Sequence, residues 1–421
     1  MGRAPVKPRF SFLQRRIFFG ICAFVACLQI RYIVVTPPPL RTYDFMEHID
    51  FMRLLATTGK FPNPSDCHLC GHPPLYYLVG AGIGRIFLAA RAFFVTLTLL
   101  SFAAFAGFLA LGLREIRASH VVTKTNALLV LSALLLAWPS GFLHAGRISN
   151  DNLSFFFNMA AFAMAAAFFR APAPRHLYLG AGCMALAFAT KSSAIVLVPV
   201  WLILVGLVAI RLPSAKRNRF FLPGLCLLGV LTAGVLFATV RTHTFTFGMN
   251  PGLVVENSWV HLFGFDLPTF LAEPFASTWT DKGGRQFFWN MLWKTSLFGE
   301  FSMGGAAHAV LATFLSAGLL FLLLFGFVGG LHGRLWKRRE LLPHLLFIAF
   351  SIAGIYYYRW KWSVSSTNDF RFIYPIVPSL VIWYGAAWNH WREVYGKPAS
   401  NAGLALAGGF ALVSCVFYGT L

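Results

Sequence analysis

Charged side chains are scarce in this sequence: only 12% of its 421 residues are Asp, Glu, Lys or Arg, about half the share found in an ordinary soluble domain. Acids are the rarest, with 14 Asp and Glu against 35 Lys and Arg. In their place, 57% of the residues are hydrophobic and the mean hydropathy is +0.67. This composition excludes a soluble enzyme and predicts a polytopic membrane protein.

The excess of basic residues, a net charge of +21, has two explanations. In a soluble protein it would suggest a nucleic-acid partner, whereas in a membrane protein Lys and Arg collect in cytoplasmic loops. With a cytoplasmic N-terminus, the inner segments hold 20 of the 35 basic residues and three of the 14 acids. These segments are 1–16, 114–124, 170–176, 211–219, 332–340 and 391–401. The distribution of basic residues therefore predicts a cytoplasmic N-terminus, and it explains the net charge without a nucleic-acid partner.

Long apolar runs bounded by charge, Pro or Gly predict an all-α bundle of about eleven transmembrane helices, each needing about 20 residues. The runs are 17–35, 92–113, 125–143, 152–169, 177–190, 192–210, 220–240, 306–331, 341–358, 372–390 and 402–420. We interpret the first as an uncleaved anchor rather than a signal peptide. Internal repeats and inverted pairs of broken helices are not evident, which weakens a transporter interpretation.

Two outer segments, 36–91 and 241–305, are long and rich in Trp, Phe, Asp and His. Loops of such length are uncommon unless they are functional. We expect juxtamembrane helices in the first of them, where Asp44, Glu47 and His48 crowd together with Asp50 nearby. On a helix, Asp44 would face Glu47 and His48 at positions i+3 and i+4. A carboxylate here could serve as a general base toward a hydroxyl, and the alternative is a solvated helix with ordinary charges.

Four further motifs are each weak alone. The run His72-Pro73-Pro74-Leu75-Tyr76-Tyr77 signals a helix start. Asp151 follows Ser149-Asn150, where Asn and Asp favour an N-cap. Lys191 ends a span, where Lys usually snorkels but could meet a phosphate. Arg371 opens a late span and could bind a phosphate with its planar fork.

The seven Cys residues are scattered. Five of them lie in apolar runs, namely Cys22, Cys27, Cys183, Cys226 and Cys415, and we interpret them as small hydrophobic residues. Cys67 and Cys70 lie in a polar outer loop beside His68 and His72. A disulfide or idle thiols are favoured there because outer thiols tend to oxidise, and a metal site is the alternative.

Taken in order, the early acid, the His-Pro-Pro motif, Asn-Asp-Asn, the span-end Lys and the late Arg-Phe-Ile-Tyr-Pro run resemble the GT-C superfamily of integral-membrane glycosyltransferases. The chain is most similar to the branch of protein O-mannosyltransferases and lipid A aminoarabinose transferases. The resemblance covers 17–210 well, the Arg371 region loosely, and 241–305 by position and one short run. It implies a transmembrane module at 17–210 with a catalytic outer loop at 36–91. C-terminal helices follow at 211–421.

The resemblance implies transfer of a monosaccharide from a polyprenyl-phosphate donor to a hydroxyl acceptor on the periplasmic or lumenal face. Asp44 matches the family's catalytic acid, although family members often carry Asp-Glu there, so Glu47 is the alternative base. Asp151 matches the family's second acid. Four residues match or adjoin positions expected to bind substrate or phosphate, namely His72, Tyr76, Lys191 and Arg371.

No cofactor is certain from the sequence; a divalent metal ion is one option, with His48 and His72 as candidate ligands. The competing hypotheses are a lipid or glycolipid transporter and a non-catalytic GT-C-like scaffold. Neither the sugar nor the acceptor follows from the sequence.

Overall fold

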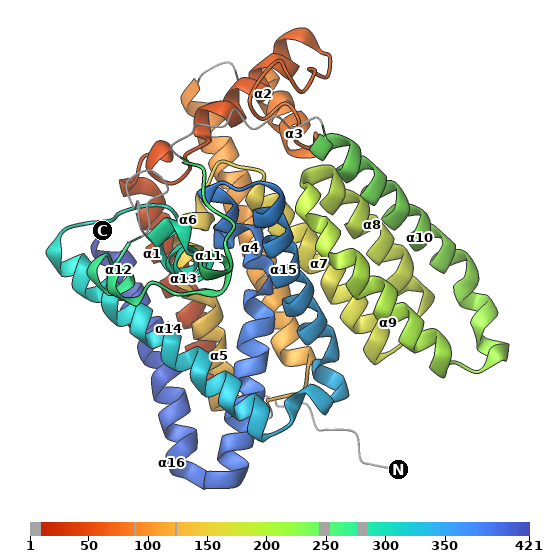
Figure 1. Ribbon diagram of the computed structural model, residues 1–421. Coiled ribbons are helices and arrows are strands. Elements are labelled where there is room, and N and C mark those ends of the chain that lie inside the picture. Colours follow the sequence, from red (N-terminus) through yellow and green to blue (C-terminus); the bar gives the residue numbers. More distant parts are fainter. Residues whose placement is uncertain (1–9, 88–89, 123, 244–252, 276–283) are drawn as a thin grey trace. The chain divides into compact units, whose positions relative to one another are not determined.

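A computed structural model describes residues 10–87, 90–122, 124–243, 253–275 and 284–421 (Figure 1). The described residues form helices, and their only β-type pairing is an isolated bridge between Val254 and Val364. This agrees with the predicted all-α class.

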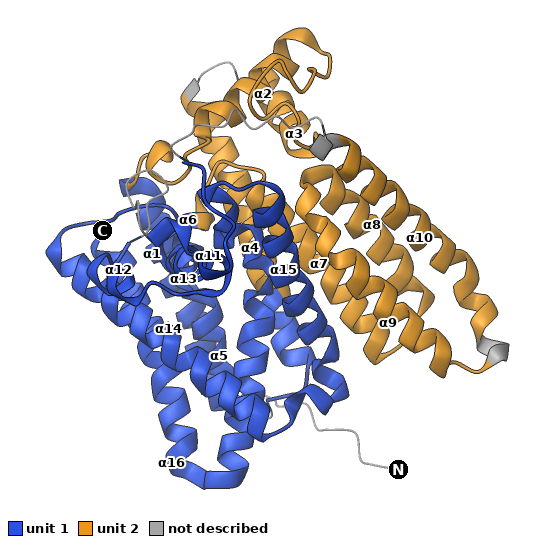
Figure 2. Ribbon diagram, in the orientation of Figure 1, with its two compact units in different colours: residues 1–35, 112–143, 251–421 blue, residues 36–111, 144–250 orange. Residues whose placement is uncertain are grey.

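The chain divides into two compact units that interleave along the sequence (Figure 2). Unit 1 comprises 1–35, 112–143 and 251–421, and unit 2 comprises 36–111 and 144–250. The sequence predicts a different division, between a transmembrane module at 17–210 and C-terminal helices at 211–421, and that division stays a prediction.

Unit 2 contains most of the predicted catalytic loop and the helices that follow it. Its helices are α2 (Phe45–Thr58), α3 (Leu75–Ile86), α7 (Asp151–Arg170), α8 (Pro174–Thr190), α9 (Leu197–Arg211) and α10 (Ser214–His243), with short 3-10 turns at Pro38–Leu40 and Ser192–Val196. Helix α4 (Ala90–Ala118) begins in unit 2 and ends in unit 1.

Unit 1 contains the first and the last helices of the chain. They are α1 (Phe12–Val35), α5 (Thr125–Leu136), α11 (Trp259–Phe263), α12 (Leu267–Ala272), α13 (Phe288–Phe298), α14 (Ala306–His332), α15 (Leu342–Lys361) and α16 (Val377–Thr420). Helix α6 (Pro139–Ala145) lies at the boundary between the units. Short 3-10 turns lie at Gly284–Gln286, Leu335–Lys337, Arg339–Leu341, Ser365–Asn368, Phe370–Phe372 and Tyr374–Ile376.

Eight helices in the described part of the chain are long and apolar enough to cross a membrane, or nine if the bent pair α5 and α6 is one span. All eleven expected runs are helical, so the difference lies in how they are divided. Helix α8 has only 17 residues, short of the roughly 20 that a span needs. Helix α16 contains the runs 372–390 and 402–420 as one element of 44 residues, broken at Gly396.

The break in α16 is a turn that only glycine adopts readily. Gly396 has φ of +74°, where a side chain would be strained. Two hydrogen bonds cross the break: the Tyr384 hydroxyl donates to the Gly403 carbonyl at 2.6 Å, and the Trp388 indole donates to the Ser400 carbonyl at 2.9 Å. The two halves of α16 therefore pack against each other as a hairpin.

In unit 2, α8 packs between α7 and α10 (Figure 1). Small residues make this packing close: a Cβ added at Gly234 of α10 would lie 2.2 Å from the Phe188 ring of α8. Since an apolar membrane gives helices little hydrophobic reason to associate, close van der Waals packing at such glycines holds them together.

Helices α2 and α3 form a separate small core at one end of unit 2, as expected for juxtamembrane helices. The apolar face of α2 contributes Ile49, Met52 and Leu55, which are all at most 5% exposed. Phe51 of α2 stacks on Tyr77 of α3 with ring centroids 3.9 Å apart. This core fixes the position of the polar residues that α2 and the loop before α3 present to the start of α7.

Candidate active site

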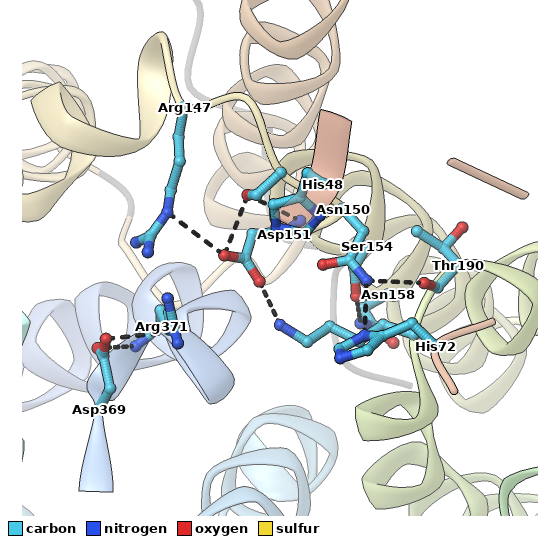
Figure 3. A network of polar contacts seen from close by, with 12 residues as sticks. His48, His72, Arg147, Asn150, Asp151, Ser154, Asn158, Thr190, Asp369 and Arg371 are labelled. Atoms are coloured by element: carbon cyan, nitrogen blue, oxygen red, sulfur yellow. Dashed lines mark hydrogen bonds and ion pairs between the residues drawn. The ribbon is translucent and has the colours of Figure 1, made fainter. Parts of the chain in front are cut away.

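A cluster of buried polar side chains lies in unit 2 where α7 begins and α8 ends. Its centre is Asp151, the first residue of α7, which is 2% exposed. The carboxylate accepts a hydrogen bond from the Ser149 hydroxyl at 3.1 Å and from the Lys191 ammonium, which follows the end of α8 (Figure 3). The Nε atom of Arg147 lies 3.6 Å from the same carboxylate.

The structure shows how the start of α7 and the end of α8 are held. Asn150 holds the N-cap position of α7, as its residue type favours; its side chain makes no capping hydrogen bond, but the Ser149 hydroxyl accepts one from the Asp151 backbone at 3.2 Å. Lys191 does not snorkel toward water, because it is 9% exposed and paired with Asp151. The Asp151 and Lys191 side chains therefore belong to one buried ion cluster.

Arg147 is a member of this cluster that the sequence interpretation missed. It is 2% exposed and stands four residues before Asp151, a spacing that places a cation beside an acid when the chain turns into a helix. A basic residue on the outer side, where few were expected, was the available signal.

Asn150 connects the cluster to the loop before α3. Its amide nitrogen lies 3.2 Å from Nδ1 of His72 and 3.3 Å from the Thr190 carbonyl. Because an amide N–H only donates, Nδ1 of His72 is the acceptor and its proton is on Nε2. His72 therefore lies beside the end of α8, and its phosphate-binding role stays a prediction.

Both histidines near the cluster are neutral at pH 7. Burial lowers the pKa of His48 to about 4 and that of His72 to about 3. His48 lies on α2, and its Nδ1 is 3.0 Å from the Tyr77 hydroxyl. His72 can consequently offer a phosphate or sugar a hydrogen bond but not a positive charge.

Asp44 lies at the N-cap position of α2, yet its side chain makes no capping hydrogen bond. The carboxylate is half-buried, and its charge raises the pKa of both His48 and His72 against the effect of burial. The charge of Glu47, in contrast, does not contribute to the pKa shift of either histidine. Asp44 is thus the acid of α2 that lies in the electrostatic range of the cluster.

The segment before α2 is anchored to the segment before α7. The Arg41 guanidinium donates to the Gly146 carbonyl at 2.8 Å, and Arg41 is 3% exposed. Asp50, further along α2, is exposed and pairs only on the surface with Arg53, at 3.7 Å. Asp50 is therefore an ordinary solvated charge, the alternative that the sequence left open for the acids of this helix.

Two other sequence predictions have clear positions. Tyr76 is 1% exposed in the core of α2 and α3, with its ring 5.9 Å from that of His48, so it supports the site as a packing residue in this structure. Cys67 and Cys70 form a disulfide with Cα atoms 5.1 Å apart, which leaves no thiolates there for a metal.

In the described part of the chain, no three His, Cys, Asp or Glu side chains gather in a group that could hold a metal ion. Asp151, the most buried acid near His48 and His72, is already neutralised by Lys191. The residues described here do not fit a metal centre, and we derive no chemical step through one.

Unit 1 contains a second polar group, which includes Arg371. The Asp369 carboxylate accepts a hydrogen bond from the Arg371 backbone at 2.9 Å and lies 3.3 Å from its Nε. The Phe370 backbone donates to the Thr295 hydroxyl of α13 at 3.0 Å. Asp369 therefore orients Arg371, and α13 holds the turn that carries both.

No protein-family model and no curated protein matches the sequence of this chain. Solved structures share its fold. ArnT from Cupriavidus metallidurans bound to undecaprenyl phosphate is 14% identical with a TM-score of 0.50, over 95% of this chain and 76% of that chain. The archaeal oligosaccharyltransferase AglB from Archaeoglobus fulgidus, in complex with an inhibitory peptide and a dolichol-phosphate, is 12% identical with a TM-score of 0.54, over 97% and 56%.

Both of these proteins belong to the GT-C superfamily of membrane glycosyltransferases. This chain has the GT-C fold and is an integral, multi-pass membrane protein. The fold that the sequence motifs predicted is thereby confirmed.

Proposed function

We propose that this protein is a glycosyltransferase that moves a monosaccharide from a polyprenyl-phosphate donor to a hydroxyl acceptor on the outer face of the membrane. The observation that carries the proposal is that a half-buried carboxylate, Asp44, lies in the electrostatic range of a buried ion cluster that contains Lys191. A phosphate-linked sugar already has a good leaving group. Its transfer needs a base for the acceptor and cations for the phosphate.

The proposed reaction is a single displacement. Asp44 accepts the proton of the acceptor hydroxyl while the oxygen of that hydroxyl forms a bond to the anomeric carbon. The bond from that carbon to the phosphate oxygen breaks, and its electron pair stays on the phosphate. Because one displacement occurs, the anomeric configuration inverts. The phosphate changes from a diester with one negative charge to a monoester that carries up to two.

Lys191 is the cation of unit 2 proposed for the phosphate, and His72 is proposed as a neutral hydrogen-bond donor to the substrate. The phosphate-binding role of Arg371, in unit 1, stays a prediction from its sequence position. Two structural neighbours with the same fold were solved with a polyprenyl phosphate, undecaprenyl phosphate in ArnT and a dolichol-phosphate in AglB. Their ligands support the proposal of a lipid-linked donor.

The test is an incubation of the purified protein with polyprenyl-phosphate sugars, with membranes of the source organism as the supply of acceptors. We expect release of polyprenyl phosphate above the rate without protein, for one sugar of a panel. Parallel reactions with EDTA and with added divalent cations report whether a metal contributes. A protein that only transports lipid would leave every donor intact, and that result would contradict the proposal.

A further inference from the structure

The buried ion cluster of unit 2 holds two cations for one anion. Arg147 and Lys191 are at most 9% exposed, and Asp151 is the acid that both approach. The neighbouring histidines contribute no charge at pH 7. Asp44, the other acid in electrostatic range, is only half-buried. Since a buried cation without a hydrogen-bonded anion is unfavourable, this cluster has a place for an anion that bonds to it directly.

Arg147 is the cation with bonding capacity to spare. A guanidinium has five N–H donors, yet the 3.6 Å separation from Asp151 is longer than a hydrogen bond. Within the described part of the chain, no hydrogen bond from Arg147 is recorded and its Nε has no partner at bonding distance. Figure 3 shows its two terminal nitrogens directed away from Asp151, with no interaction drawn to them.

Asp151, in contrast, has little capacity left. One oxygen accepts from Lys191, and the other accepts from Ser149 and faces Arg147. Both oxygens are therefore occupied by donors or cations, which leaves little room for a further contact. The geometry of Asp151 suits an anchor that orients cations.

From these contacts we infer that Arg147 binds the phosphate group of the lipid-linked donor alongside Lys191, and that Asp151 is a positioning residue for both cations. This inference rests on the proposed function and assigns Asp151 a different task from the catalytic one that its sequence position predicts.

The charges of the reaction agree with this assignment. Arg147, Lys191 and Asp151 together carry one positive charge, which matches the single negative charge of a polyprenyl-phosphate sugar. As the bond from the anomeric carbon to the phosphate oxygen breaks, a second negative charge develops on the phosphate. A guanidinium fork can then donate two parallel hydrogen bonds to two phosphate oxygens.

The experiment measures binding of undecaprenyl phosphate and of the uncharged alcohol undecaprenol to the purified full-length protein. We expect Arg147→Met to weaken binding of the phosphate by about 10- to 100-fold, the effect of one lost charge-assisted contact, and to leave binding of the alcohol unchanged. Arg53→Met is the matched control, because Arg53 lies on the exposed face of α2 and pairs only with Asp50.

Arg147→Gln provides a second variant that keeps hydrogen-bond donors and loses the charge, in case the Met variant does not fold. We expect it to show the same selective loss. Equal losses for the phosphate and the alcohol, or no loss for either, would overturn the inference, since a merely structural Arg147 cannot discriminate between the two ligands.

Kinetics separate this inference from the proposed function. If the wild-type protein releases polyprenyl phosphate from a donor while Arg147→Met binds that phosphate as tightly as wild type, the inference fails and the proposed function stands. If the wild type neither binds undecaprenyl phosphate nor releases it from any donor, both fail. Asp151→Asn should raise KM for the donor, and it should retain a measurable kcat because the proposed base is intact.

Discussion

The starts of α2 and α7 offer an instructive comparison, because each places an aspartate beside the N-terminus of a helix in unit 2. Asp44 is half-buried, with a carboxylate that α2 does not use as a cap. Asp151 is 2% exposed and engaged by Lys191 and Ser149. The same residue type at a similar local position is thus half-buried in one region and engaged by buried cations in the other, and we propose the role of base only for the first. Burial and partners, rather than residue type, separate the two roles.

The largest effect on this comparison should come from Asp44→Asn. Loss of a general base typically costs about 100- to 10,000-fold in rate, and we expect a loss in that range. The measurement is the rate of polyprenyl phosphate release from the donor. The thermal unfolding midpoint, measured in parallel, separates loss of the base from loss of the fold.

Asp50→Asn is the control for that measurement, since Asp50 is an exposed acid on the same helix. Its rate should equal that of wild type. An Asp44→Asn protein that retains full activity would remove Asp44 from the role of base.

Asp151→Asn should have the opposite profile, with its main effect on stability. Removal of one partner from a buried ion pair typically costs about 3–5 kcal/mol, because Lys191 and Arg147 would remain buried without their counter-charge. The midpoint of thermal unfolding in detergent checks this. Should Asp151→Asn unfold like wild type and also lose all transfer activity, the contrast between the two aspartates would be wrong.

A smaller effect on the free energy of unfolding is expected when the pH is lowered. His48 has a pKa of about 4 in the folded protein because it is buried, whereas an unfolded histidine titrates near 6.5. Below pH 6.5 the unfolded chain therefore binds a proton that the folded protein excludes. The stability that neutral His48 supports is complete above pH 6.5 and is lost as the pH falls toward 4, by about 2 kcal/mol at pH 5.

The pH profile of the unfolding midpoint measures this loss. His48→Gln should make the profile shallower between pH 7 and pH 5, and His68→Gln should not, since His68 is exposed. A profile of the same steepness in wild type and His48→Gln would mean that His48 titrates normally in the folded protein.

The smallest effect is expected from Glu47→Gln, which tests whether α2 has one functional acid or two. Glu47 is half-buried like Asp44, but among the acids at the start of α2 only the charge of Asp44 acts on His48 and His72. We expect less than about a threefold change in transfer rate, well below the range for loss of a base. A loss as large as that of Asp44→Asn would make Glu47 an equal candidate for the base.

Much of the fold followed from the sequence because membrane spans are long apolar runs, and such runs are visible without tertiary information. The bend between α5 and α6, and the single-glycine turn that joins the two predicted spans within α16, were not visible in the same way. The bend between α5 and α6 is 54°, and the hairpin depends on Gly396 at a φ of +74°. A glycine in an apolar run does not reveal which φ it adopts, since that depends on contacts such as the one between Tyr384 and Gly403.

Within the site, the motifs indicated Asp44, His72, Asp151 and Lys191 as separate signals, and the structure brings these four into one electrostatic neighbourhood in unit 2. Arg147 escaped notice because a single Arg in an outer loop resembles any solvated cation. The bonding of Cys67 to Cys70 was one of three alternatives in the sequence, and the structure contains the disulfide.

By itself, the order of apolar runs determined that this protein is a helical membrane protein, because hydrocarbon surroundings permit few other arrangements of the backbone. Which acid is buried among cations was decided only by the tertiary structure. The start of α7 and the end of α8 bring Arg147 and Lys191 to Asp151, whereas Asp44 at the start of α2 is half-buried. Electrostatic interactions depend on distance and burial, and neither is written in the order of the residues.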